Sequence, residues 1–226
     1  MKYFGVNLRK KADGMKLARE NYVKMNNKSS LEDGKIYTDE FCQKHYKNAL
    51  KNYDINMKYF ASLSKDDFNQ ELNKFLSLNP KIVEITNLND ITTAGYYMLV
   101  LDDYCQVYIG TSGNIKKRVM GHWSKTKEFD RLIFGGIDNS ILSIDSFRAL
   151  DTKRIYAFAT NNIFNMEEDL ISSFPQKYSL NRTKGGRLEG GLEEAIIHRR
   201  TRTTNNKESC GKRSLIQKII DKFKRF

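Results

Sequence analysis

The chain has 226 residues, of which 39% are hydrophobic and 12% aromatic, so it can bury a sizeable core and is not disordered throughout. No apolar run approaches the roughly 18 residues that a membrane span needs, and basic residues interrupt the start of the chain before a signal segment could form, so we expect a cytoplasmic protein. The formal net charge of +12 favours a polyanionic partner, with nucleic acid ahead of an anionic membrane surface, and no stable membrane association is expected.

The cysteines suggest neither a disulfide framework nor a zinc site. The three of them, Cys42, Cys105 and Cys210, are scattered and form no Cys-x-x-Cys pair. An odd number without that spacing fits a reducing compartment. Cys42 and His45 form one Cys-x-x-His half of a zinc pattern, but no second half follows, so we predict no zinc.

Residues 1–90 favour helices, and the clearest helix covers residues 64–78. Its apolar side chains recur at helical spacing: Phe68, Leu72, Phe75 and Leu76. Ser64 begins a pattern that resembles a capping box, and Pro80 prevents the helix from continuing. A second helix is expected to begin near Thr38. We interpret this part of the chain as a helical accessory region.

From Gly95 the period of the apolar residues changes from that of a helix to that of a strand. Residues 95–101 and 106–109 are rich in Tyr, Val, Ile and Leu and flank a short polar connection, which predicts a β-hairpin. Asn114 then suits the N-cap of a helix that runs from residue 115 to about residue 123.

Two strands and a further helix are expected after that point. Residues 140–147 and 154–159 alternate like strands, and residues 166–174 have helical periodicity. The order of hairpin, helix, strands and helix predicts a mixed α/β (α+β) fold in which a small antiparallel sheet is flanked by helices. We assign this core to residues 91–188.

The end of the chain, residues 189–226, is expected to form a basic tail. The glycine-rich run at residues 185–191 lacks the Gly-Lys-Ser/Thr ending of a phosphate-binding P-loop and is interpreted as a hinge. Near the C-terminus, apolar residues gather on one side of a short basic amphipathic helix. Such a tail suits an arm that contacts phosphates, and the alternatives are a packed terminal helix or a contact with a membrane surface.

A two-part tyrosine motif lies on the predicted hairpin. Gly95-Tyr96-Tyr97 is followed, after ten residues, by Tyr108-Ile109-Gly110. This pattern resembles the GIY-YIG nuclease superfamily, with Tyr96 where isoleucine is usual. Tyrosines in strands are most often half-buried packing residues, so the motif gains weight from the residues that follow it.

Four later residues match the same family in order and spacing. Arg118 lies eight residues after Gly110, and His122 lies four residues further on, so the two side chains share one face of the predicted helix. Glu167 begins a Glu-x-x-Leu-Ile run and shares its face with the apolar residues of that helix. Asn181 matches the asparagine that follows this helix in the family and helps to position the site.

The resemblance implies a metal-dependent endonuclease that hydrolyses phosphodiester bonds, with DNA favoured over RNA. In that role Tyr97 is the general base with Tyr108 beside it, and Arg118 clamps phosphate oxygens. Glu167 holds Mg²⁺ or Mn²⁺, and His122 activates water or orients phosphate. A phenol with an ordinary pKa of about 10 acts as a base near neutral pH only if nearby positive charge lowers that pKa.

Further basic residues are expected to contact the phosphates of a nucleic acid: Lys116, Lys117, Arg199, Arg200 and Arg202. Many family members have a lysine directly after the second motif, whereas this chain has Thr111 there. The alternative interpretation is a non-catalytic nucleic-acid-binding protein with a GIY-YIG-like fold.

Overall fold

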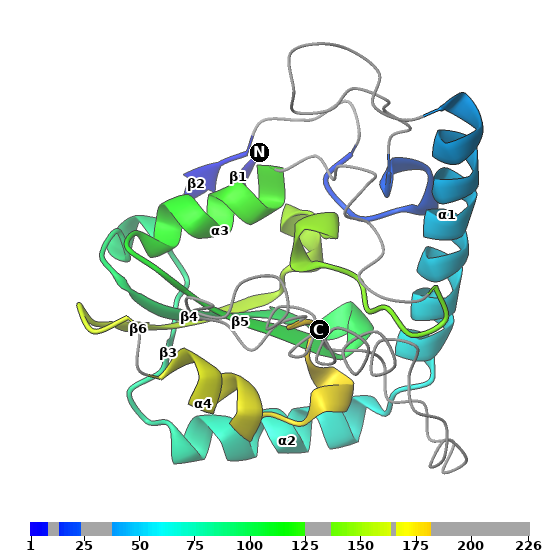
Figure 1. Cartoon of the computed structure of the whole chain (residues 1–226). Coiled ribbons are helices and arrows are strands. Elements are labelled where there is room, and N and C mark those ends of the chain that lie inside the picture. Colours follow the sequence, from blue (N-terminus) through cyan, green and yellow to red (C-terminus); the bar gives the residue numbers. More distant parts are fainter. Residues whose placement is uncertain (9–13, 24–37, 125–136, 164–165, 182–226) are drawn as a thin grey trace, which may run out of the picture.

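The computed structural model has a mixed α/β architecture built around an antiparallel sheet, with helices on both faces of that sheet (Figure 1). The residues that it describes are 1–8, 14–23, 38–124, 137–163 and 166–181. The predicted class, a small antiparallel sheet flanked by helices, is confirmed. The predicted basic tail at residues 189–226 lies outside the described residues. Within the described ranges, no helix combines the length and the apolar character that crossing a membrane requires.

The central sheet has four strands in the order β3-β6-β4-β5, and every neighbouring pair is antiparallel. Its strands are β3 (Val83–Glu84), β4 (Gly95–Leu101), β5 (Gln106–Ser112) and β6 (Arg154–Ala159). The β4–β5 connection is a 3₁₀ helix at Asp102–Tyr104 followed by Cys105, whose φ of 50° is left-handed. The predicted strands 95–101 and 154–159 are confirmed. The predicted strand 106–109 is also present, and it continues to Ser112.

Four α-helices are found among the described residues: α1 (Asp39–Ala61), α2 (Lys65–Leu78), α3 (Ile115–Ser124) and α4 (Glu167–Ser173). Three of them begin where predicted, because Thr38 Oγ1, Ser64 Oγ and Asn114 Oδ1 each accept from the backbone N–H three residues later. The helix α3 covers one face of the sheet, and α2 and α4 cover the other (Figure 1).

Alternation along β4 divides the core into two layers. Tyr97 and Leu99 pack in the layer that contains apolar residues of α1 and α3, whereas Tyr96 and Met98 pack in the layer of α2 and α4. Each layer combines residues from the N-terminal 90 residues with residues of the later chain. The helices α1 and α2 therefore pack into the same hydrophobic core as the sheet.

The prediction that residues 1–90 are helical does not hold at either end of this region. The strands β1 (Lys2–Tyr3) and β2 (Val6–Asn7) form a separate antiparallel pair, and β3 is an edge strand of the central sheet. Strands of two residues have too little periodicity to be recognised in a sequence. Short 3₁₀ helices also lie at Arg19–Asn21 and Leu88–Asp90.

The predicted strand at residues 140–147 is wrong as well. This segment contains a 3₁₀ helix at Ile144–Ser146. Two buried asparagines of α1, Asn52 and Asn56, donate from their side-chain amides to the backbone oxygen of Ser140 (2.8 and 2.9 Å). The apolar pattern of the segment therefore reflects packing against α1 rather than pairing within the sheet.

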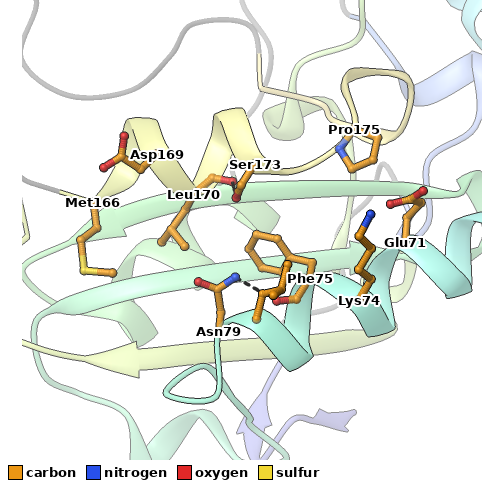
Figure 2. A pocket seen from close by; sticks show the side chains of 10 residues that line it. Glu71, Lys74, Phe75, Asn79, Met166, Asp169, Leu170, Ser173 and Pro175 are labelled. Atoms are coloured by element: carbon orange, nitrogen blue, oxygen red, sulfur yellow. Dashed lines mark hydrogen bonds between the residues drawn. The ribbon is translucent and has the colours of Figure 1, made fainter.

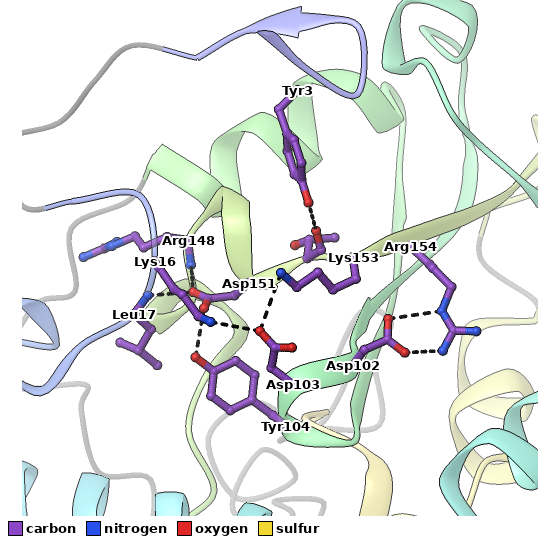
Figure 3. A network of polar contacts seen from close by, with 11 residues as sticks. Tyr3, Lys16, Leu17, Asp102, Asp103, Tyr104, Arg148, Asp151, Lys153 and Arg154 are labelled. Atoms are coloured by element: carbon purple, nitrogen blue, oxygen red, sulfur yellow. Dashed lines mark hydrogen bonds and ion pairs between the residues drawn. The ribbon is translucent and has the colours of Figure 1, made fainter. Parts of the chain in front are cut away.

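A buried carboxylate, Asp151, joins the N-terminal segment to the core (Figure 3). It ends a 3₁₀ helix at Ala149–Asp151 and accepts from the backbone N–H groups of Leu17 (2.8 Å) and Arg148 (2.7 Å) and from Tyr104 Oη (2.8 Å). Burial and the Asp151 charge raise the pKa of the Tyr104 phenol, which therefore remains a hydrogen-bond donor at neutral pH.

Asp151→Ala is expected to lower the free energy of unfolding by about 3 kcal/mol or more, because three donors lose a buried acceptor. Asp103→Ala is the matched control, since Asp103 pairs with the partly exposed Lys16 and Lys153 (2.9 and 3.5 Å) and such pairs contribute at most about 1 kcal/mol. Urea-induced unfolding at pH 7 measures both variants. Equal losses would contradict the role assigned to Asp151.

Candidate active site

Two phenols, Tyr97 and Tyr108, are neighbours on the face of the sheet that α3 covers. In the β4–β5 register Tyr97 is opposite Gly110 and Tyr108 is opposite Leu99, so the two tyrosines are diagonal neighbours. Their ring centroids are 6.2 Å apart. A Cβ atom on Gly110 would lie 2.6 Å from Tyr97 Oη and 3.0 Å from Tyr108 Cε1, so the glycine provides the space that the two rings occupy.

The helix α3 brings His122 to this pair of phenols. Ile115 and Val119 are buried in the same layer as Tyr97 and hold the helix against the sheet. His122 Nε2 is 2.8 Å from Tyr97 Oη, and the Tyr108 ring lies edge-on to the imidazole with the centroids 5.2 Å apart. With 2% of its surface exposed, the histidine is a core residue of the cluster rather than a surface side chain.

Arg118 lies one turn before His122 on α3 and has an exposed side chain. Its guanidinium interacts with the phenol of Tyr97. Arginine keeps its charge at any pH of interest and can bind two phosphate oxygens at once. The cluster therefore has a permanent cation where it meets solvent.

Asp145 also belongs to this cluster, although no pattern in the sequence indicates it. Its Oδ1 is 2.6 Å from His122 Nδ1, and its side chain is 23% exposed. Ser143 Oγ accepts from the Asp145 backbone N–H (3.3 Å) at the start of the 3₁₀ helix. A Ser-x-Asp pattern is a turn signal, but no spacing in the sequence connects this turn with His122.

Glu167 is the first residue of α4 and is buried, with 8% of its surface exposed to solvent. The neighbouring Glu168 is exposed. Leu170 is buried on the same face as Glu167, as the helical spacing predicts. The Glu167 charge acts to raise the pKa of both Tyr97 and Tyr108, in addition to the larger effect of burial. The carboxylate therefore acts electrostatically on the two phenols.

Tyr96, the residue that departs from the family pattern, anchors the start of α4. Its Oη donates to the backbone oxygen of Asn162 (2.9 Å) and accepts from the backbone N–H of Met166 (3.1 Å). Because Met166 directly precedes Glu167, this phenol fixes the backbone that carries the carboxylate. Isoleucine could form neither hydrogen bond.

Asn181 is buried, and its side chain forms two hydrogen bonds with the backbone of β5, the edge strand of the sheet. Its Oδ1 accepts from the backbone N–H of Ile109 (3.0 Å), and its Nδ2 donates to the backbone oxygen of the same residue (2.6 Å). Ile109 lies between Tyr108 and Gly110. Asn181 is therefore placed to position the β5 half of the motif through the backbone.

A phenol that acts as a general base near neutral pH needs a lowered pKa, but the pKa values of both phenols here are raised. Burial raises the pKa of Tyr97 well above 10, and Tyr108 adds to that effect, while Arg118 opposes it. Burial also raises the pKa of Tyr108. Desolvation outweighs the nearby cation, so both phenols are protonated at neutral pH and Tyr97 is a hydrogen-bond donor.

The expected phosphate-contacting residues do not all belong to this cluster. Lys116 donates from Nζ to Asn89 Oδ1 (2.7 Å) at the surface, and Lys117 is exposed on α3. The other expected contacts lie outside the described residues: Arg199, Arg200 and Arg202.

A groove of about 320 Å³ lies between α2 and α4 (Figure 2). Phe75 and Leu170 line it, and both belong to the layer of Tyr96 rather than that of Tyr97. The groove is therefore on the far side of the sheet from the phenols and the imidazole, and it is separate from the candidate site.

Comparison of the chain with models of protein families, with curated proteins and with solved structures finds no match.

Proposed function

We propose that this chain is a metal-dependent endonuclease of the GIY-YIG type that hydrolyses nucleic acid phosphodiester bonds, with DNA as the preferred substrate. The observation that carries the proposal is the contact of Tyr97 Oη with His122 Nε2 at 2.8 Å, beside Tyr108 and Arg118. These groups can take up a proton and bind a phosphate. The net charge of +12 supports a polyanionic substrate.

In the proposed reaction a water molecule attacks phosphorus, and the bond from phosphorus to the leaving oxygen breaks. One proton of the water moves to Tyr97 Oη, and the phenol's own proton moves to His122 Nε2. Because burial disfavours a free phenolate, a concerted transfer through the neutral phenol suits this site. Arg118 binds the phosphoryl oxygens on which negative charge accumulates, and the leaving oxygen takes a proton from solvent.

Glu167 would hold the divalent ion. Mg²⁺ in enzymes is commonly bound by one or two carboxylates together with water and substrate phosphates, and a single inward-facing carboxylate fits that arrangement. Among the described side chains, no three His, Cys, Asp or Glu residues form a group that could hold a metal ion by protein ligands alone. When bound, Mg²⁺ or Mn²⁺ supplies positive charge for the phosphoryl and leaving oxygens.

Incubation of the purified chain with plasmid DNA, linear duplex, single-stranded DNA and RNA tests the proposal. We expect cleavage in Mg²⁺ or Mn²⁺, none in EDTA, and a loss of about 10²-fold or more in Tyr97→Phe, which lacks the relaying hydroxyl. Tyr59→Phe is a matched control, because the half-buried Tyr59 donates its hydroxyl to Lys177 O (3.0 Å) in a solvent-exposed hydrogen bond. Binding without cleavage under every ion would favour the non-catalytic alternative.

A further inference from the structure

We propose that Asp145 is a positioning residue that fixes the tautomer and the orientation of His122, so that Nε2 faces Tyr97 as a proton acceptor. The inference rests on the proposed function, because it assigns a partner to the imidazole that receives the proton. It adds a carboxylate from the segment between α3 and β6 to a site otherwise built from the β4–β5 hairpin, α3 and α4.

The two ring nitrogens of His122 have chemically different partners. A carboxylate only accepts hydrogen bonds, so the contact of Asp145 Oδ1 with Nδ1 at 2.6 Å places a proton on Nδ1. The neutral imidazole then has a lone pair on Nε2, which accepts from the Tyr97 hydroxyl at 2.8 Å. Contacts at both nitrogens prevent the ring from flipping and select one tautomer.

The charge on Asp145 also matters when Nε2 takes up its proton. Tyr97 of β4 and Asp145 contact the nitrogens of the imidazole, and Tyr108 of β5 packs edge-on against its ring. Arg118 of α3 and Glu167 of α4 act electrostatically on the two phenols that adjoin it. Arg118 disfavours an imidazolium beside it, whereas the directly bonded Asp145 carboxylate stabilises that ion. Asp145 therefore supports His122 in both of its protonation states.

The tautomer of His122 can be measured by ¹⁵N NMR on the full chain labelled at histidine, which has three histidines. The spectrum of His122→Gln assigns the signals. In the wild-type chain at pH 8 we expect a protonated Nδ1 and an unprotonated Nε2. In Asp145→Asn this preference should weaken or reverse, because an amide can also donate to Nδ1. A wild-type spectrum with the proton on Nε2 overturns the inference, whether or not the variant folds.

Cleavage kinetics give a second measurement, because a purely structural role of Asp145 would not shift the pH–rate profile. In Asp145→Asn we expect kcat to fall by about 10- to 10³-fold with little change in KM. The acid limb of the pH–rate profile should move to lower pH, because the imidazolium loses its carboxylate. Asp138→Asn is the matched control, since Asp138 forms an exposed pair with Lys51 (3.4 Å) and should keep wild-type kinetics. Wild-type kcat and pH profile in Asp145→Asn overturn the inference.

The two proposals fail separately. If the wild-type chain cuts no nucleic acid but His122 has the expected tautomer, the proposed function is wrong and the positioning by Asp145 stands. If the wild-type chain cuts and Asp145→Asn retains both its kinetics and its tautomer, the proposed function stands and the role of Asp145 is wrong.

Discussion

Glu167→Ala is expected to reduce cleavage by about 10³-fold or more while nucleic acid affinity stays within a few-fold of wild type. The reason is that this carboxylate is the proposed anchor of the divalent ion and acts electrostatically on both phenols, whereas affinity depends on basic side chains elsewhere. Cleavage is measured in Mg²⁺ and in Mn²⁺, and binding is measured by fluorescence anisotropy of labelled duplex DNA in EDTA.

Glu168→Ala is the matched control for this substitution. Glu168 lies in the same first turn of α4 and its loss changes the charge near the helix start equally, but its side chain is exposed. We therefore expect it to cut at the wild-type rate. If Glu167→Ala retains wild-type cleavage, the metal assignment is wrong, and if the two variants lose activity equally, the effect comes from the helix and not from a metal ligand.

The elements that support the site could be predicted because each has its own local signal. The alternation along residues 95–101 and 154–159 and the cap at Asn114 need no knowledge of distant contacts, and the structure has these elements where the patterns place them. The inward direction of Glu167 was predictable in the same way, from the positions of Leu170 and Ile171 one turn later.

Other features of the site depend on contacts between distant segments and have no local signal. Asp145 meets His122 from a 3₁₀ helix, in a segment that hydrogen-bonds to α1 through Ser140 and does not form the predicted strand. The raised pKa of Tyr97 likewise follows from burial by several elements, which outweighs the opposing effect of Arg118. The use of Tyr96 as the anchor of α4 depends on where Met166 lies after the fold has formed.

Gly110→Ala is expected to reduce cleavage by about 10²-fold and to lower the free energy of unfolding by about 1 to 3 kcal/mol. The new Cβ would lie 2.6 Å from Tyr97 Oη and 2.8 Å from its Cζ, which is closer than non-bonded atoms approach. Gly110 is not among the glycines with positive φ, so the effect arises from lost space and not from backbone strain. The displaced phenol would lose its contact with His122.

Gly113→Ala tests whether any added methyl group near the hairpin has this effect, because no heavy atom beyond its adjoining residues lies within 4 Å of a Cβ there. It should leave both cleavage and stability close to wild type.

A double-mutant cycle then identifies the side chain with which the added methyl group of Gly110→Ala collides. Tyr97→Phe alone removes the hydrogen bond to His122 and is expected to destabilise the protein by about 1 kcal/mol. In the Gly110→Ala background the same change removes the atom that lies nearest to the new Cβ, so stability should rise instead, although cleavage should not return. Additive losses of stability in the double variant would show that the methyl group disturbs something other than the hydroxyl of Tyr97.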